Sequence, residues 1–424
     1  DRRAGLPRLV LAASSAALLA GCASVPPRED ARSYGVSGAR LQRLAATVRD
    51  DVQKGTYPGA VVMIARNGTV VFSDAFGVQN PRTGAPMKVD SIFRIASMTK
   101  PIVSVGVMTL VEDGRVQLGD PASKYLAELK GLKVGIEKKD ASGNDVLEEV
   151  QAQREMTVQD LLRHTSGLTY GIFGRSAVKQ KYLEAKVDGD PNQTNAELVR
   201  RLSKLPLAYQ PGTTWEYGRS TDVLGALIER VSGQTLDVFL AERILKPLRM
   251  NDTGFHVDPS QHGRIAEPFD LDPDTKAPAR VAAVLTPPQL LSGGGGMVST
   301  AGDYLRFAQM LLNGGELDGA RILSRKTVEL MTSDHLGTGV ARTALYFPGP
   351  GYGFGLGFAV RTAAGESAVP GSIGDYYWPG LYGTLFFVDP KEKLIGIWMM
   401  QRVNQPTNQV IWRRFKSQVY AAID

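Results

Sequence analysis

The chain has very few of the residues that make disulfides and metal sites. Among its 424 residues there is one cysteine, Cys22, and there are four histidines, His164, His256, His262 and His335. A single cysteine excludes an internal disulfide, so the fold must rely on its hydrophobic core. The four histidines lack the spacing of a zinc ligand set, and none lies in a late segment as an α/β-hydrolase triad requires. We therefore expect neither a metal nor another cofactor.

Long apolar runs and charge clusters are also missing. No internal segment approaches the roughly 20 apolar residues that a membrane-spanning helix needs. Hydrophobic residues make up 43% and charged residues 22% of the chain, which is typical of a globular protein. The net charge of +6 is spread along the sequence, which argues against a nucleic-acid partner. The length suits one large domain or two closely packed ones.

The N-terminus differs from the rest of the chain. Three arginines precede a short apolar run over residues 9–20, which is the pattern of an export signal. The run ends in Leu19 to Cys22, which resembles a bacterial lipobox and implies lipid attachment at Cys22. We expect residues 1–21 to be a lipoprotein signal peptide and residues 22–37 a tether. The protein would then be exported and bound to a membrane through this lipid alone, or periplasmic or extracellular if it is not lipidated; the sequence leaves its oligomeric state open.

Hydrophobic periodicity predicts a sheet and helices at the start of the chain. Apolar spacing over residues 38–55 predicts an amphipathic helix. Residues 60–64 and 69–72 are β-rich, and the Asn67-Gly68 pair between them is typical of a tight hairpin turn. An almost wholly apolar helix is expected from about Ser97 to Glu112.

Strand patterns return near the C-terminus. Residues 382–388 and 394–400 are β-rich, and a last amphipathic helix is expected over 408–422. We therefore predict an α+β fold in which one antiparallel sheet, built from both chain ends and flanked by helices, accompanies a mostly helical domain. The expected boundaries are 38–113 together with 288–424 for the sheet domain and 114–287 for the helical domain.

The first chemical motif is Ser97 to Lys100, an S-x-x-K sequence. Residues three apart in a helical turn share a face, so the amine can accept the hydroxyl proton. Burial and the helix N-terminus both favour the neutral amine that a general base requires. A second copy, Ser176 to Lys179, lies in a polar segment that we interpret as a loop. Ser97 is the better nucleophile candidate because it stands where a strand meets an apolar helix.

Two further segments carry chemistry. Tyr217 lies in a turn just before a helix, and a tyrosine fixed there can transfer protons if cations stabilise its phenolate. Trp378 to Thr384 is glycine-rich and is expected to enter a strand. Glycines in that position let a substrate approach the backbone and leave amides free to bind an oxyanion.

Together, these three segments resemble the serine β-lactamase and penicillin-binding-protein superfamily, most closely its class C and family VIII carboxylesterase branch. The resemblance extends over 161–168, 245–250 and 295–300. It implies that Ser97 is acylated, that Lys100 and Tyr217 move its proton, and that the amides of Ser97 and Leu381 form the oxyanion hole. It also implies substrate contacts at Trp378 and Gly380. Which of Lys100 and Tyr217 takes the first proton stays open.

Departures from the lactamase pattern favour an esterase. This chain has Arg219 where the lactamase pattern Tyr-x-Asn has asparagine, and Trp378-Pro379-Gly380 where it has Lys-Thr-Gly. Loss of the Lys-Thr pair removes groups expected to hold a β-lactam carboxylate. We predict a serine carboxylesterase that cleaves small-molecule esters, with at most weak β-lactam hydrolysis. The alternatives are a class C-like β-lactamase, a peptidase acting on D-residues, an acyltransferase, and a non-catalytic cell-wall binding module.

Neighbouring residues receive structural interpretations. His164 is expected to be a packed core histidine, Gly293 to Gly296 a close-packed loop, and Arg219 a surface charge. The aromatic segments 170–173 and 346–354 are expected to rim the pocket and to favour an apolar acyl or aryl group.

Overall fold

The computed structural model describes residues 30–143, 145–188 and 190–424. Cys22 and the expected signal peptide lie outside the described residues, as does the first half of the expected tether, residues 22–29. None of the helices in the described residues combines the length and the apolar character needed to cross a bilayer.

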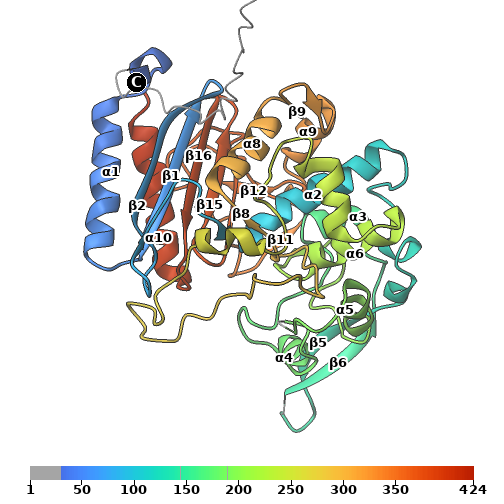
Figure 1. Ribbon diagram of the computed structural model, residues 1–424. Coiled ribbons are helices and arrows are strands. Elements are labelled where there is room, and N and C mark those ends of the chain that lie inside the picture. Colours follow the sequence, from blue (N-terminus) through green and yellow to red (C-terminus); the bar gives the residue numbers. More distant parts are fainter. Residues whose placement is uncertain (1–29, 144, 189) are drawn as a thin grey trace, which may run out of the picture.

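The centre of the molecule is an eight-stranded antiparallel sheet in the order β12-β13-β14-β15-β16-β1-β2-β3 (Figure 1). The two chain ends meet where β1 pairs with β16, with Val62 opposite Trp398. This confirms the predicted fold class. The strands are β1 (Gly59–Arg66), β2 (Thr69–Asn80), β3 (Ala85–Pro86), β12 (Tyr352–Phe354), β13 (Ala359–Arg361), β14 (Tyr376–Pro379), β15 (Leu385–Asp389) and β16 (Leu394–Met400).

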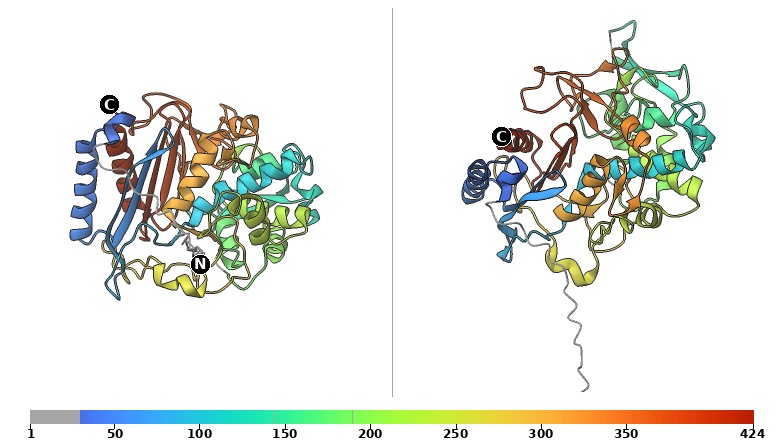
Figure 2. Two further views of the ribbon diagram at one scale, coloured as in Figure 1. Left: turned by 45° about the horizontal axis from the view of Figure 1, so that its top comes forward. Right: turned by 90° about the horizontal axis from the view of Figure 1, so that it is seen from above.

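Helices cover both faces of this sheet. The helices α1 (Gly38–Gln53) and α10 (Gln405–Ala421) lie side by side on one face, and α8 (Ala301–Leu312) packs against the other (Figures 1 and 2). Alternating residues of β1 therefore enter two different cores. Val62 and Ile64 pack toward α1 and α10, whereas Val61 and Met63 belong to the core that continues into the helical part.

The helical part is organised around α2 (Thr99–Glu112), which is buried along almost its whole length and packs on α6 (Ser220–Ser232). A helix that is apolar all round belongs in a core rather than at a surface, so α2 gives the site a rigid support. The other α-helices are α3 (Val158–Leu162), α4 (Ala177–Glu184), α5 (Asn195–Leu202), α7 (Leu236–Leu240) and α9 (Arg325–Met331).

Two hairpins in the structure bear on the sequence analysis. The Asn67-Gly68 turn is confirmed, because both residues have positive φ angles, 51° and 77°. The middle of the chain also contains a hairpin that the sequence analysis missed, β5 (Lys133–Lys139) with β6 (Asp145–Gln151). Its strands are rich in charged residues and largely exposed, so they lack the apolar pattern that marks a strand.

The glycine-rich segment from Trp378 to Thr384 does enter a strand, because β15 begins at Leu385. The sequence analysis missed that Trp378 itself lies in another strand, β14. Between the two strands Gly380 to Thr384 form a tight turn, in which the Gly380 amide donates to the Thr384 carbonyl at 2.8 Å. The described sheet thus has an extra hairpin at this point, and Trp378 lies on its first strand.

Candidate active site

Ser97 lies in a short 3-10 turn, η2 (Ala96–Met98), between β4 (Phe93–Arg94) and α2. The α-helix therefore begins two residues later than expected. Ala96 has a φ of +44°, a conformation that costs energy for a residue with a Cβ and that turns the chain sharply before the serine. The carbonyl of Met98 accepts a hydrogen bond from Tyr304 at 2.9 Å, which fixes the other side of the turn.

Lys100 is buried directly beside this serine. Its Nζ atom lies 3.2 Å from Ser97 Oγ, 3.2 Å from the Tyr170 hydroxyl and 2.6 Å from the Gly294 carbonyl oxygen. A neutral amine has two N–H donors and one lone pair. It can donate to Gly294 and Tyr170 while its lone pair accepts the Ser97 proton, so the three neighbours match what a general base needs.

The electrostatic surroundings of Lys100 favour this neutral form. Burial lowers the pKa of Lys100, Asp222 opposes this shift and Arg219 adds to it, and together they bring the pKa to about 7. Removing an ammonium group from water is costly, so desolvation dominates. The lysine is therefore uncharged in a large part of the population near neutral pH.

Tyr217 stands just before α6 with its ring 4.5 Å from Lys100 Nζ. Its hydroxyl accepts a hydrogen bond from the indole N–H of Trp378 at 3.3 Å. Burial raises the pKa of Tyr217 above its ordinary value, although hydrogen bonds with Ser97 and Trp378 oppose this. Tyr217 is thus a neutral phenol near neutral pH and is suited to pass a proton rather than to take the first one.

The amides expected to form the oxyanion hole belong to Ser97 and Leu381. In the part of the chain that the structure describes, neither amide has a protein acceptor. The turn that contains Leu381 lies directly against the turn that contains Ser97. A Cβ on Gly380 would lie only 2.3 Å from the Ile95 carbonyl oxygen and 2.2 Å from Thr384 Oγ1. Gly380 therefore permits close contact with the backbone at Ile95, and it also lines the cavity above Ser97.

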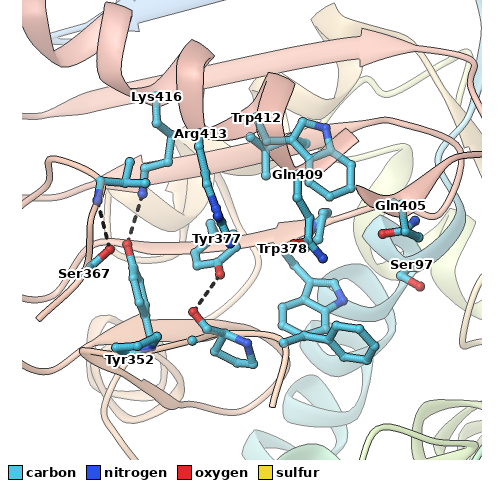
Figure 3. A pocket seen from close by; sticks show the side chains of 18 of the residues that line it. Ser97, Tyr352, Ser367, Tyr377, Trp378, Gln405, Gln409, Trp412, Arg413 and Lys416 are labelled. Atoms are coloured by element: carbon cyan, nitrogen blue, oxygen red, sulfur yellow. Dashed lines mark hydrogen bonds between the residues drawn. The ribbon is translucent and has the colours of Figure 1, made fainter. Parts of the chain in front are cut away.

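A cavity of about 350 Å³ opens above Ser97 (Figure 3). Its wall is mostly aromatic and aliphatic, and it includes Trp378 and Gly380. Of the aromatic segments expected at its rim, Phe173 and Phe347 do line it, whereas Tyr170 lies deeper, beside Lys100. An apolar group can therefore be desolvated next to the nucleophile.

Arg219 is not the surface charge that we expected. It is buried, and its guanidinium donates to Asp188 at 2.8 Å and to Asp222 at 3.2 Å. The guanidinium also lies 5.0 Å from the centre of the Tyr170 ring. Two buried carboxylates require a buried cation, which explains why an arginine follows the tyrosine motif at this position.

The second S-x-x-K sequence has a structural role. Ser176 is the N-cap of α4, where its hydroxyl accepts from the Lys179 amide at 3.1 Å, so it does not lie in a plain loop. The Lys179 amine points elsewhere and pairs with Glu216 at 2.8 Å. The expectation for His164 is confirmed, because it is buried among Trp215, Tyr217 and Phe354.

The sequence analysis missed three residues that hold Lys100 in place. Tyr170 and Gly294 contact its amine directly, and Asp222 accepts from the Gly294 amide at 3.0 Å. A Cβ at Gly294 would lie 2.5 Å from Asp222 Oδ2, so the glycine run is indeed closely packed. The sequence signals that could have indicated them were the glycine run and an aspartate in the first turn after Tyr217.

Residues 30–143, 145–188 and 190–424 contain no group of side chains arranged to hold a metal ion.

Comparison with known proteins shows which sequences and structures this chain is similar to. A family model described as Beta-lactamase matches residues 44–420. A protein from Mycobacterium tuberculosis is 36% identical over 368 residues, covering 84% of this chain and 88% of the relative. Esterase EstB from Burkholderia gladioli is 31% identical over 385 residues, covering 85% and 90%. Among solved structures, EstCE1, described as a hydrolase with promiscuous acyltransferase activity, aligns with a TM-score of 0.73 and 25% identity over 91% of this chain and 98% of its own.

Proposed function

The chain belongs to the beta-lactamase family, and from that premise we propose that it is a serine carboxylesterase acting through an acyl-enzyme on Ser97. The observation that carries the proposal is the contact of 3.2 Å between Lys100 Nζ and Ser97 Oγ at the floor of a largely apolar cavity. Trp378 forms part of the cavity wall where a lactamase pattern has lysine. The 31% identical relative EstB is named an esterase, which supports this choice within the family.

The first half of the reaction forms the acyl-enzyme. Neutral Lys100 accepts the Ser97 proton as Oγ attacks the ester carbonyl carbon, and the carbonyl oxygen becomes an oxyanion. The free amides of Ser97 and Leu381 would bind that oxyanion, a contribution worth about 10²- to 10³-fold per donor in related chemistry. When the carbon–oxygen ester bond breaks, the proton on Lys100 passes through the Tyr217 hydroxyl to the leaving alkoxide, which departs as an alcohol.

The second half returns the enzyme to its starting state. A water molecule replaces the alcohol and gives one proton to Lys100 as its oxygen attacks the acyl carbon. The bond to Ser97 Oγ then breaks, the proton moves to Oγ, and the carboxylic acid leaves. Tyr170 and Gly294 keep the lysine amine in place throughout, because they accept its two N–H bonds.

A comparison of esters with β-lactams tests this function. A β-lactamase must grip the ring carboxylate, and each charge-assisted hydrogen bond that is missing costs about 1.5–3 kcal/mol. We expect kcat/KM for p-nitrophenyl butyrate to exceed that for nitrocefin by at least about a hundredfold. Equal values, or a preference for nitrocefin, would overturn the esterase proposal in favour of a class C-like β-lactamase.

Acyl transfer to an alcohol is a second candidate activity. EstCE1 is described as a hydrolase with promiscuous acyltransferase activity, and the apolar cavity above Ser97 suits an alcohol better than water. Adding 1-butanol to a p-nitrophenyl butyrate reaction should then give butyl butyrate beside butyric acid. Butyric acid as the sole product would limit the enzyme to hydrolysis.

A further inference from the structure

The cavity above Ser97 does not end at the nucleophile. It continues along one face of α10, where the lining residues Gln405, Gln409, Arg413 and Lys416 follow at spacings of four, four and three. Figure 3 shows Ser97 and Gln405 at one side of this cavity and Lys416 at the other, with Arg413 between them beside Tyr377. The far end of the cavity is therefore built differently from its reactive end.

Arg413 has an unusual position among the cations of α10. Its neighbours each have a carboxylate partner, since Arg414 pairs with Asp51 and Lys416 lies 3.4 Å from Asp375. Arg413 is exposed and lines the cavity, and within the described ranges it has no hydrogen-bond or ion-pair partner. An unpaired guanidinium on a cavity wall is a ready binding group for a carboxylate.

The buried carboxylate on this side of the cavity, Asp375, forms no ion pair with Arg413 in the described chain. Asp375 is shared by two cations, Arg361 at 2.7 Å and Lys416 at 3.4 Å. The acidic residue that lines the cavity, Glu366, is exposed and forms no ion pair with Arg413 in the described chain.

The position of Arg413 on α10 also sets the distance between the reacting carbonyl of a substrate and the guanidinium. Gln405 donates to the Leu381 carbonyl at 2.9 Å and so marks the oxyanion end. Arg413 lies eight residues further along α10, which is about 12 Å along the helix axis. An extended chain advances about 1.2 Å per bond, so roughly ten bonds separate the reacting carbonyl from the guanidinium.

We propose that Arg413 binds an anionic group of the substrate, so that the preferred ester carries a carboxylate roughly ten bonds from its reacting carbonyl. This proposal rests on the esterase function proposed above and names the substrate class of the same site. The apolar wall, which includes Trp412 and Tyr377, contacts the chain between ester and carboxylate. The Gln409 side chain lies on the same face, within reach of that chain.

Two pairs of esters matched in length test the proposal. In the first pair the carboxylate is on the acyl part, and the mono-p-nitrophenyl ester of sebacic acid is compared with p-nitrophenyl decanoate. In the second pair it is on the alcohol part, and the acetate ester of 10-hydroxydecanoic acid is compared with decyl acetate. In one of the two pairs, we expect kcat/KM for the ester that carries the carboxylate to exceed that for its neutral counterpart by about 10- to 100-fold. One charge-assisted hydrogen bond provides a difference of this size.

Variants of α10 separate charge recognition from folding. Arg413→Gln should bring the acid-to-neutral ratio close to one, and Arg413→Lys should restore part of it. Arg414→Gln removes the same charge from the adjacent position, outside the cavity, and should leave the ratio unchanged. A ratio near one in the wild type for both pairs, or a preference that survives in Arg413→Gln, would overturn the proposal. If the wild type hydrolyses none of the four esters, it is the esterase function that fails.

Discussion

The indole N–H of Trp378 donates to the phenolic oxygen of Tyr217 across 3.3 Å, and the two rings lie 5.4 Å apart. This contact connects β14 to the segment before α6, close to the turn that contains Ser97. In a lactamase pattern a lysine would stand in the place of Trp378. In place of a charge that could bind a carboxylate, Trp378 therefore supplies a hydrogen-bond donor that orients the Tyr217 hydroxyl.

Replacement of Trp378 by phenylalanine should show how much this hydrogen bond contributes to kcat. Trp378→Phe keeps an aromatic ring but removes the donor, and a net loss of about 0.5–1.5 kcal/mol corresponds to a 2- to 10-fold lower kcat. Trp398→Phe is a suitable control, since Trp398 is equally buried and its N–H has no acceptor in the described chain. Steady-state kinetics with p-nitrophenyl butyrate should show the loss only at position 378. Equal losses in both variants would assign the effect to packing.

The acidity of Lys100 predicts the pH profile. Because burial lowers the pKa of Lys100 to about 7, the neutral base is lost as the pH falls below that value. From about pH 5 to about pH 9, kcat/KM should rise roughly tenfold per unit at first and then level off above pH 7. A profile that still rises beyond about pH 9 would identify the Tyr217 phenolate as the base instead.

Arg219 and Asp222 should shift that profile in opposite directions. Arg219 lowers the pKa of Lys100 and Asp222 raises it, so Arg219→Gln should move the acid limb to higher pH and Asp222→Asn to lower pH. Breaking buried pairs costs about 3–5 kcal/mol, so thermal melting must show that both variants are folded, and Arg219→Lys serves as the charge-preserving control. Shifts of the same sign would exclude this electrostatic account.

The Gly380 turn offers a test of the oxyanion geometry. In Gly380→Ala the new Cβ would lie within about 2.3 Å of the Ile95 carbonyl, which forces the Leu381 amide away from Ser97. A displacement of about 1 Å can cost 10²-fold in rate, so kcat should fall by about that factor while KM changes little. Gly119→Ala, at a site where no atom is within 4 Å, is the control. Wild-type kcat in Gly380→Ala would remove Leu381 from the oxyanion hole.

Local patterns explain what could be predicted from the sequence. The Ser97 and Lys100 pair depends on a three-residue spacing, which fixes a shared helical face before any tertiary contact forms. Helices α1 and α6 and strands β1 and β16 follow from apolar periodicity alone. These features need no knowledge of distant residues.

Tertiary contacts explain what could not be predicted. Tyr170 and Gly294 reach the Lys100 amine from positions 70 and 194 residues away, and no local pattern encodes such a meeting. In the sequence, Arg219 looks like an ordinary surface arginine, because its partner Asp188 lies 31 residues away and only the fold brings the two together. Strand β14 has four residues and is too short for alternation to mark it, so the sequence analysis missed that Trp378 lies in a strand.

Covalent labelling of the nucleophile tests the central claim most directly. The wild type treated with a fluorophosphonate probe should gain one equivalent of label, and peptide mass mapping should place it on Ser97. Ser97→Ala should take up no label and should lose hydrolysis of p-nitrophenyl butyrate by several orders of magnitude, whereas Ser176→Ala should be labelled like the wild type. Label on Ser176, or undiminished labelling and turnover in Ser97→Ala, would contradict the account.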